Sequence, residues 1–202
     1  MVQILDAALV EFSERGFAAA RMDDIARRCG LSKGGLYAHF AGKEEVFEAL
    51  LTRSLAPPDL GEMPALAAGV RPMAQWVVNK LYDSLGRPGA VATLRLLVAE
   101  SGRVPHLIEL WKCNVVQPHL TLLGDILRAH AVQEGVVPSV ITQEPWLALS
   151  PVVHALLSQV VLGGADPQDL DHYRQGHVAL LCELLDPASR ILPQPVPQSS
   201  AK

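Results

Sequence analysis

Cysteine, aromatic residues and basic charge are all scarce in this 202-residue sequence. Its three cysteines lack the spacing of a zinc ribbon or a redox motif, which excludes a disulfide framework and favours a reducing compartment. The formal net charge is -4, which argues against a nucleic-acid binder because most such proteins are basic. Hydrophobic residues nevertheless make up 50% of the chain, so it can bury a sizeable core and is not disordered as a whole.

The N-terminus has no basic segment followed by a long apolar run, so we expect no signal peptide. Residues 145–165 contain no Asp, Glu, Lys or Arg and reach the length of a membrane-spanning helix. However, Ser150, His154 and Ser158 recur every four residues on one face, and no basic anchors flank the segment. The sequence therefore predicts a helix buried within or between proteins, no membrane partner and a cytoplasmic location.

Helical periodicity recurs along the chain and no segment alternates as a strand does, which predicts an all-α fold. A run of prolines at residues 56–59 marks a boundary between a domain at 1–55 and a larger helical domain at 56–186. The Pro-rich tail at 187–202 lacks a packing face, and we expect it to be disordered. In the second domain the expected helices cover about residues 70–85, 89–102, 105–115, 118–134, 145–163 and 168–185.

The first domain contains the sequence form of a helix-turn-helix: two short helices joined by a tight turn with glycine, Cys29 to Ser32. Gly30 is expected to end the second helix in the left-handed conformation. Ser32 is expected to cap the third helix by accepting from the backbone amides of residues 34 and 35. The side chains predicted to form the core between the helices are Ile25, Ala26, Leu36 and Phe40.

In the DNA-binding form of this motif, the third helix enters the major groove by its N-terminal residues. Gly34 and Gly35 in its first turn each cost about 1 kcal/mol relative to Ala, a cost that makes sense if the backbone approaches an anionic partner closely. A plain helical hairpin with Ser32 as an ordinary cap is the alternative. The side chains that can reach phosphates or a base edge are Lys33, Tyr37, His39 and Lys43.

The order and spacing of these elements resemble the DNA-binding domain of the tetracycline-repressor (TetR) family. The resemblance covers about 50 residues, from Gly16-Phe17 to Lys43-Glu44-Glu45-Val46-Phe47. It implies a homodimeric transcriptional regulator, a repressor, that is not an enzyme. Its N-terminal three-helix domain would bind a near-palindromic double-stranded DNA operator, and its larger C-terminal helical domain would dimerise and bind a small, apolar inducer. The predicted DNA-binding set is Ser32, Lys33, Gly34, Gly35, Tyr37, His39 and Lys43.

Three positions depart from the family pattern. The family often has Thr at the position of Ala20, where it caps the second helix, a side chain at the position of Gly35, and a Ser or Asn cap at the position of Gly42. These departures concern operator affinity and sequence preference rather than the fold. They motivate an alternative to the repressor: a helical ligand-binding or scaffold dimer that has lost specific DNA binding.

Aromatic and polar side chains on otherwise apolar helices are candidates for lining a ligand pocket, although ordinary core packing is the alternative for each aromatic. The face that carries His154 lines either this pocket or a dimer interface. The ligand-binding candidates are Trp76, Tyr82, Trp111, His119, Trp146 and His154.

The last two predicted helices would pair with their symmetry mates in a four-helix bundle. The apolar side chains expected to supply this interface are Val153, Leu156, Leu157, Val160 and Val161 on the first helix and Leu180, Leu181, Leu184 and Leu185 on the second.

Other motifs are weak. Residues 30–34 formally match G-x-S-x-G, but a helix precedes them where the nucleophile elbow of hydrolases needs a strand. His172 and His177 are five residues apart and do not share a helical face. We therefore predict no catalytic residue, no metal site and no cofactor.

Charge within the first domain is nearly balanced: residues 1–55 hold seven basic and eight acidic side chains. Between Ser32 and Gly42 there is no acidic residue, so the global charge does not exclude DNA. It predicts weak non-specific binding and strong salt sensitivity.

Overall fold

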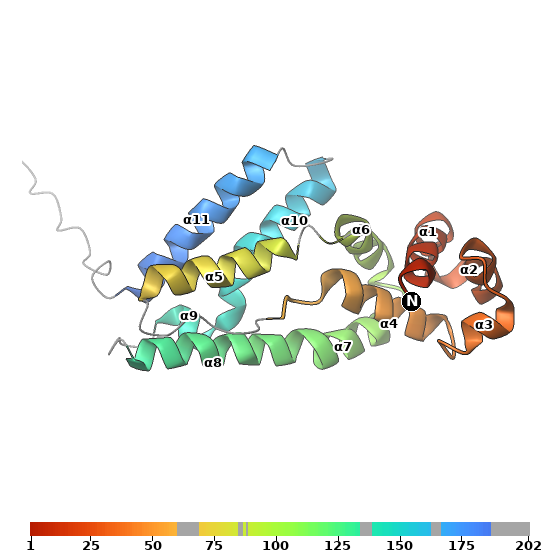
Figure 1. Cartoon of the computed structure of the whole chain (residues 1–202), viewed down its shortest axis with the longest axis horizontal. Coiled ribbons are helices and arrows are strands. Elements are labelled where there is room, and N and C mark those ends of the chain that lie inside the picture. The colour runs from red at the N-terminus through yellow and green to blue at the C-terminus, as the bar shows by residue number, and fades with distance from the viewer. Residues whose placement is uncertain (60–68, 85–86, 88, 134–138, 163–166, 187–202) are drawn as a thin grey trace, which may run out of the picture.

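The computed structural model describes residues 1–59, 69–84, 87, 89–133, 139–162 and 167–186, and the regular elements in these ranges are all helical (Figure 1). The all-α prediction is therefore confirmed. The predicted disordered tail at 187–202 lies outside the described residues.

Four helices form the N-terminal end: α1 (Val2–Ala19), α2 (Met22–Arg28), α3 (Lys33–Tyr37) and α4 (Lys43–Leu55). Gly16 has a φ of 73° and breaks the helical backbone near the end of α1. A side chain is strained at such a φ, which explains a glycine at this turn. The chain therefore changes direction here before α2 begins.

The predicted C-terminal helices are present with shifted bounds: α5 (Val70–Asp83), α6 (Ala90–Glu100), α7 (Pro105–Trp111), α8 (Gln117–Gln133), α10 (Ser150–Leu162) and α11 (Pro167–Leu185). A π-helical segment, Lys112–Val116, joins α7 to α8 where we expected a break. The short α9 (Val140–Gln143) was not predicted, and the segment expected to form one helix from 145 begins as a 3-10 turn, Pro145–Ala148.

Buried residues form two clusters. The first is built on the aromatic rings of Phe12, Phe17 and Phe47, whose centroids lie 5.2–5.7 Å apart, and it extends to Leu96 on α6 and Leu107 on α7. The second joins α5, α8, α9, α10 and α11. The boundary at 55/56 stays a prediction, because α6 and α7 contribute to the N-terminal core.

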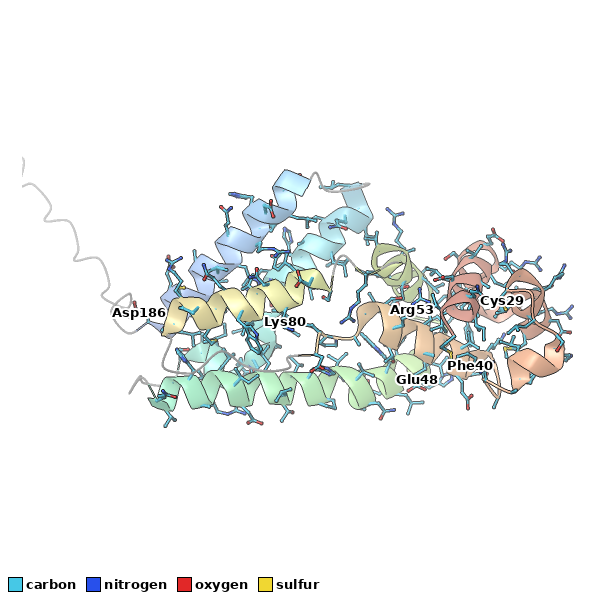
Figure 2. All side chains as sticks on the ribbon, in the orientation of Figure 1. Cys29, Phe40, Glu48, Arg53, Lys80 and Asp186 are labelled. Carbon is cyan, nitrogen blue, oxygen red and sulfur yellow. The ribbon has the colours of Figure 1, made fainter. Side chains whose placement is uncertain are left out.

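The helices α4, α6 and α7 lie between the two ends of the molecule (Figure 1). Helix α4 packs against both α6 and α7, and Asn114 in the α7–α8 junction lies 3.5 Å from Glu48 on α4. Figure 2 shows Glu48 and Arg53 in this middle region, Cys29 and Phe40 at one end and Asp186 at the other. In the described part of the chain, this layer of α4, α6 and α7 therefore offers a route by which a displacement in the C-terminal helices can reach α1–α3.

No helix within the described ranges is long and apolar enough to cross a membrane. The uncharged segment at residues 145–165, whose length matched a membrane-spanning helix, contains α10, which has only 13 residues.

Candidate functional site

The turn between α2 and α3 has the predicted geometry. Gly30 adopts a φ of 72°, and the Leu31 backbone amide donates to the Ala26 carbonyl at 2.9 Å, which closes the end of α2. The Ser32 hydroxyl accepts from the Gly35 amide at 3.0 Å and so caps α3. Leu36 is fully buried, which holds α3 against α2.

Helix α3 is short, and its outer face is open to solvent. Lys33 and His39 are exposed, and the Tyr37 side chain is 44% exposed. A Cβ added at Gly34 would meet nothing within 4 Å, so the backbone is accessible there. His39 lies in the turn that follows α3 rather than within the helix. The structure thus brings the predicted residues 32–39 together on one exposed surface.

Lys33 is held by an acid from α2. Its ammonium lies 3.0 Å from a carboxylate oxygen of Asp23, and 5.9 Å from the centre of the Tyr37 ring. The hydrogen bond to Asp23 raises the pKa of Lys33 above its ordinary value. Sequence reasoning missed this contact because it searched for acids only between Ser32 and Gly42.

Lys43 has a structural role that the sequence did not predict. Its ammonium donates to the carbonyls of Phe17 and Ala18, at 3.0 and 2.9 Å, and lies 4.8 Å from the centre of the Phe17 ring. It therefore ties the end of α1 to the start of α4. One of its three N–H groups remains for a phosphate.

The expectation that Ala20 occupies the cap position of α2 was wrong. The N-cap residue is Arg21, and Ala20 is buried, 3% exposed. Arg21 is exposed, and its side chain makes no hydrogen bond or ion pair within the described residues, although its backbone carbonyl accepts from the amides of Asp24 and Ile25.

A network of ion pairs orients α2 on α1. Glu11 is fully buried and is contacted by Arg15 at 3.1 Å and Arg28 at 3.2 Å. Arg28 also binds Glu14 at 2.6 Å, and its hydrogen bond to Glu11 is the main cause that raises its pKa. This fixed geometry positions α3, because α3 packs on α2.

The structure describes all seven basic side chains of residues 1–55, and six of them form ion pairs or hydrogen bonds with other groups of the chain. In addition to those above, Arg27 pairs with Asp24 and Arg53 with Asp6. Arg21 is the exception.

At the other end of the molecule, α5, α8 and α10 border an apolar cleft. Its two adjoining parts share Pro57, Pro58, Leu81 and Leu149, and the larger part measures about 100 Å³. Polar groups reach it from His119 and Ser84, and the His119 ring nitrogen Nδ1 is 2.7 Å from the Val115 carbonyl oxygen. We call this the Pro57 cleft. The proline pair that signalled a boundary in the sequence also forms one wall.

Among the six ligand-binding candidates, His119 lines the Pro57 cleft as the structure describes it. Tyr82 is buried in the second core, where burial raises its pKa to about 12. Trp76 and Trp111 are half-buried against the second and first cores, as ordinary packing predicts. Trp146 is 53% exposed and donates to Glu144 at 2.9 Å. His154 is exposed, with its ring edge-on to Tyr173 at 5.6 Å.

Leu181 and Leu185 were expected at a dimer interface and instead lie in the second core, 0% and 1% exposed. They face α5, which packs along α11. The exposed apolar side chains of this region are Val153, Leu157, Val161, Leu162 and Leu180.

No group of three or more His, Cys, Asp or Glu residues that could hold a metal ion occurs in the described part of the chain.

An all-α chain with an exposed, capped helix-turn-helix at one end defines the class of helix-turn-helix transcriptional regulators. Residues 4–50 match the family described as "Bacterial regulatory proteins, tetR family". The transcriptional regulator SrpR of Pseudomonas putida is 32% identical over 136 residues, which cover 67% of this chain and 62% of SrpR. The regulator TtgW, also of Pseudomonas putida, is 34% identical over 96 residues, which cover 48% of this chain and 70% of TtgW.

Solved structures share the fold. A TetR family regulator from Pseudomonas syringae superposes with a TM-score of 0.67 at 22% identity, over 90% of this chain and 93% of that one. The flavonoid-responsive regulator FrrA gives a TM-score of 0.63 at 26% identity, over 92% and 96% of the two chains.

The chain belongs to the TetR family of DNA-binding transcriptional regulators. Its relatives are named as regulators and not as enzymes.

Proposed function

We propose that this chain is a homodimeric repressor that binds a near-palindromic operator and leaves it when a small apolar inducer binds. The observation that carries the proposal is the exposed surface of residues 32–39, where a capped helix start, two glycines and a lysine–tyrosine pair stand together. Free backbone amides at a helix start attract phosphate, and the adjacent side chains can reach phosphates or base edges.

The exposed apolar side chains of α10 and α11 support a homodimer. Leu157 and Val161 lie four residues apart on α10, one turn beyond Val153, which also borders the Pro57 cleft, and Leu180 is 40% exposed on α11. Such a stripe is unusual on an isolated surface and is buried when two copies form a four-helix bundle. The exposed His154 lies on the same helix, which favours the interface over the pocket for its role.

The Pro57 cleft supports an inducer site. Its lining is apolar with a few polar groups, as ligand sites require, but its volume is below the usual range of about 300–1,000 Å³. An inducer would therefore select a conformer in which α5, α8 and α10 stand further apart. Helix α4, which runs from Lys43 to the cleft wall at Leu55, would carry that displacement to α1–α3. The flavonoid-responsive character of FrrA agrees with a ligand of low polarity.

DNase footprinting on the DNA upstream of the chain's own coding region tests this function. We expect protection of two half-sites, one helical turn or a multiple of it apart, since two symmetric recognition helices meet successive major grooves. A folded dimer that protects no site at low salt would contradict the repressor and leave the ligand-binding or scaffold dimer as the function.

A further inference from the structure

Asp23 on α2 brings negative charge to the surface on which Lys33 and Tyr37 stand. Its two carboxylate oxygens lie 3.0 and 3.2 Å from Lys33 Nζ, although ten residues separate the pair in sequence. Both side chains remain mostly open to solvent, 65% for Lys33 and 59% for Asp23. In the chain without DNA, the ammonium at the start of α3 therefore already has an anionic partner.

A buried acid of the same domain, Glu11, cannot serve the same purpose. Glu11 is fully buried between Arg15 and Arg28, so breaking its contacts would leave an unpaired charge in the core. The Lys33–Asp23 pair is exposed, and water and salt screen exposed pairs of this kind, so they add little stability. Lys33 can thus release Asp23 for a phosphate at little cost.

We infer that Asp23 is an intramolecular competitor of DNA for Lys33: on binding, the Lys33 ammonium exchanges the Asp23 carboxylate for a phosphate oxygen. The inference rests on the proposed function, because it requires the surface of residues 32–39 to meet DNA. Phosphate contacts carry no sequence information, so an acid that weakens one of them lowers the affinity for every sequence alike. Asp23 thereby lowers the absolute affinity for operator and non-operator DNA by the same factor, and the ratio between the two affinities is left to the base contacts.

The structure offers a matched control in Asp6. Its side chain is 56% exposed, close to the value for Asp23, and it also pairs with a basic residue, Arg53. Asp6→Asn makes the same change in net charge within the same domain, but Asp6 lies on α1 and pairs with α4, and neither side chain touches α3.

The test is a double-mutant cycle of Asp23→Asn and Lys33→Ala, measured by fluorescence anisotropy with an unrelated 30-bp duplex and with the upstream fragment. We expect Asp23→Asn to raise affinity for the unrelated duplex about 3- to 10-fold at low salt, because Lys33 then has no carboxylate to give up before it meets a phosphate. The gain should fall below about twofold when Lys33 is Ala, and Asp6→Asn should change affinity by less than about twofold.

An equal gain with and without Lys33 would overturn the inference, because Asp23 would then act only by repelling phosphates. A loss of affinity in Asp23→Asn would overturn it as well, because Asp23 would then position Lys33 for DNA. If the wild-type dimer binds neither duplex at low salt, the proposed function fails and the inference with it. Wild-type binding without a response to Asp23→Asn contradicts the inference alone.

Discussion

Glu11 on α1, in the helix-turn-helix end of the molecule (the DNA end), and His177 on α11, at the C-terminal end, are buried almost equally, 0% and 2% exposed. Their surroundings differ. Two arginines from α1 and α2 reach Glu11, so the contacts have fixed directions. His177 packs its ring against Tyr82 at 5.8 Å within an apolar cluster, and burial lowers its pKa to about 4.

The difference separates the two tasks of the molecule. Directional ion pairs hold α2 and α3 in one orientation, which a recognition surface needs. Apolar packing around the Pro57 cleft has no such directions, so its helices can shift past one another when a ligand enters. The same contrast extends to the surface, where the DNA end pairs its charges internally and α10 leaves apolar side chains uncovered.

Breaking the apolar surface should have the largest effect. Leu157→Asp places a charge on the exposed stripe of α10, so we expect a monomer and a loss of about a thousandfold in operator affinity, since each half-site then binds alone. Sedimentation velocity and footprint titration measure the two outcomes. Leu122→Asp, at a leucine of α8 with a similar exposed fraction, should remain a dimer. A dimeric Leu157→Asp variant would remove α10 from the interface.

Acid should destabilise the C-terminal end through His177. The folded chain keeps the ring neutral down to pH about 4, whereas the unfolded chain takes up the proton below about 6.5. Stability contributed by the neutral ring is therefore complete above pH 6.5 and is lost as the pH falls toward 4. We expect the wild type to lose up to about 3 kcal/mol more than His177→Gln across this window, in urea unfolding at one fixed protein concentration. If the free energy of unfolding falls equally with pH in the two proteins, His177 is not the source of the acid sensitivity.

Removing the exposed Tyr37 ring tests whether the surface of residues 32–39 contacts DNA. Tyr37→Ala should lower operator affinity about tenfold without changing the unfolding midpoint, because the side chain is 44% exposed and outside the core. Trp146→Ala, at an exposed ring far along the chain, should leave binding unchanged. Equal binding by wild type and Tyr37→Ala would show that the ring does not contact DNA.

Lys43→Ala should have the smallest effect on affinity, a few-fold loss for every sequence. We expect the slope of log affinity against log salt to fall by about one unit per half-site if the remaining N–H of Lys43 meets a phosphate. Because Lys43 also binds the Phe17 and Ala18 carbonyls, the end of α1 should exchange its amide hydrogens faster. Lys112→Ala is the control, since Lys112 pairs with Glu109 on α7. An unchanged slope would leave Lys43 with its structural role alone.

Local signals predicted the helix-turn-helix well, because its determinants are close in sequence. Ser32 caps the helix that follows it and Gly30 ends the one before, so spacing alone located both. The contacts of Lys33 and Lys43 were missed, because they join residues 10 and about 25 positions apart and depend on how α2 and α1 pack.

The C-terminal helices were located by periodicity, but their faces were assigned less well. Leu181 and Leu185 lie on the side of α11 that packs on α5, and the hydrophobic pattern does not say which apolar side meets the chain and which meets a partner. The Pro57 cleft likewise depends on the approach of α5, α8 and α10, which no local signal specifies.

Backbone hydrogen–deuterium exchange with and without the operator duplex tests most directly whether residues 32–43 form the DNA-binding surface. We expect slower amide exchange at residues 32–43 when the duplex binds, and the same exchange on α10 as in the free dimer. Protection confined to the C-terminal helices, or none at residues 32–43 under conditions of full binding, would contradict this expectation.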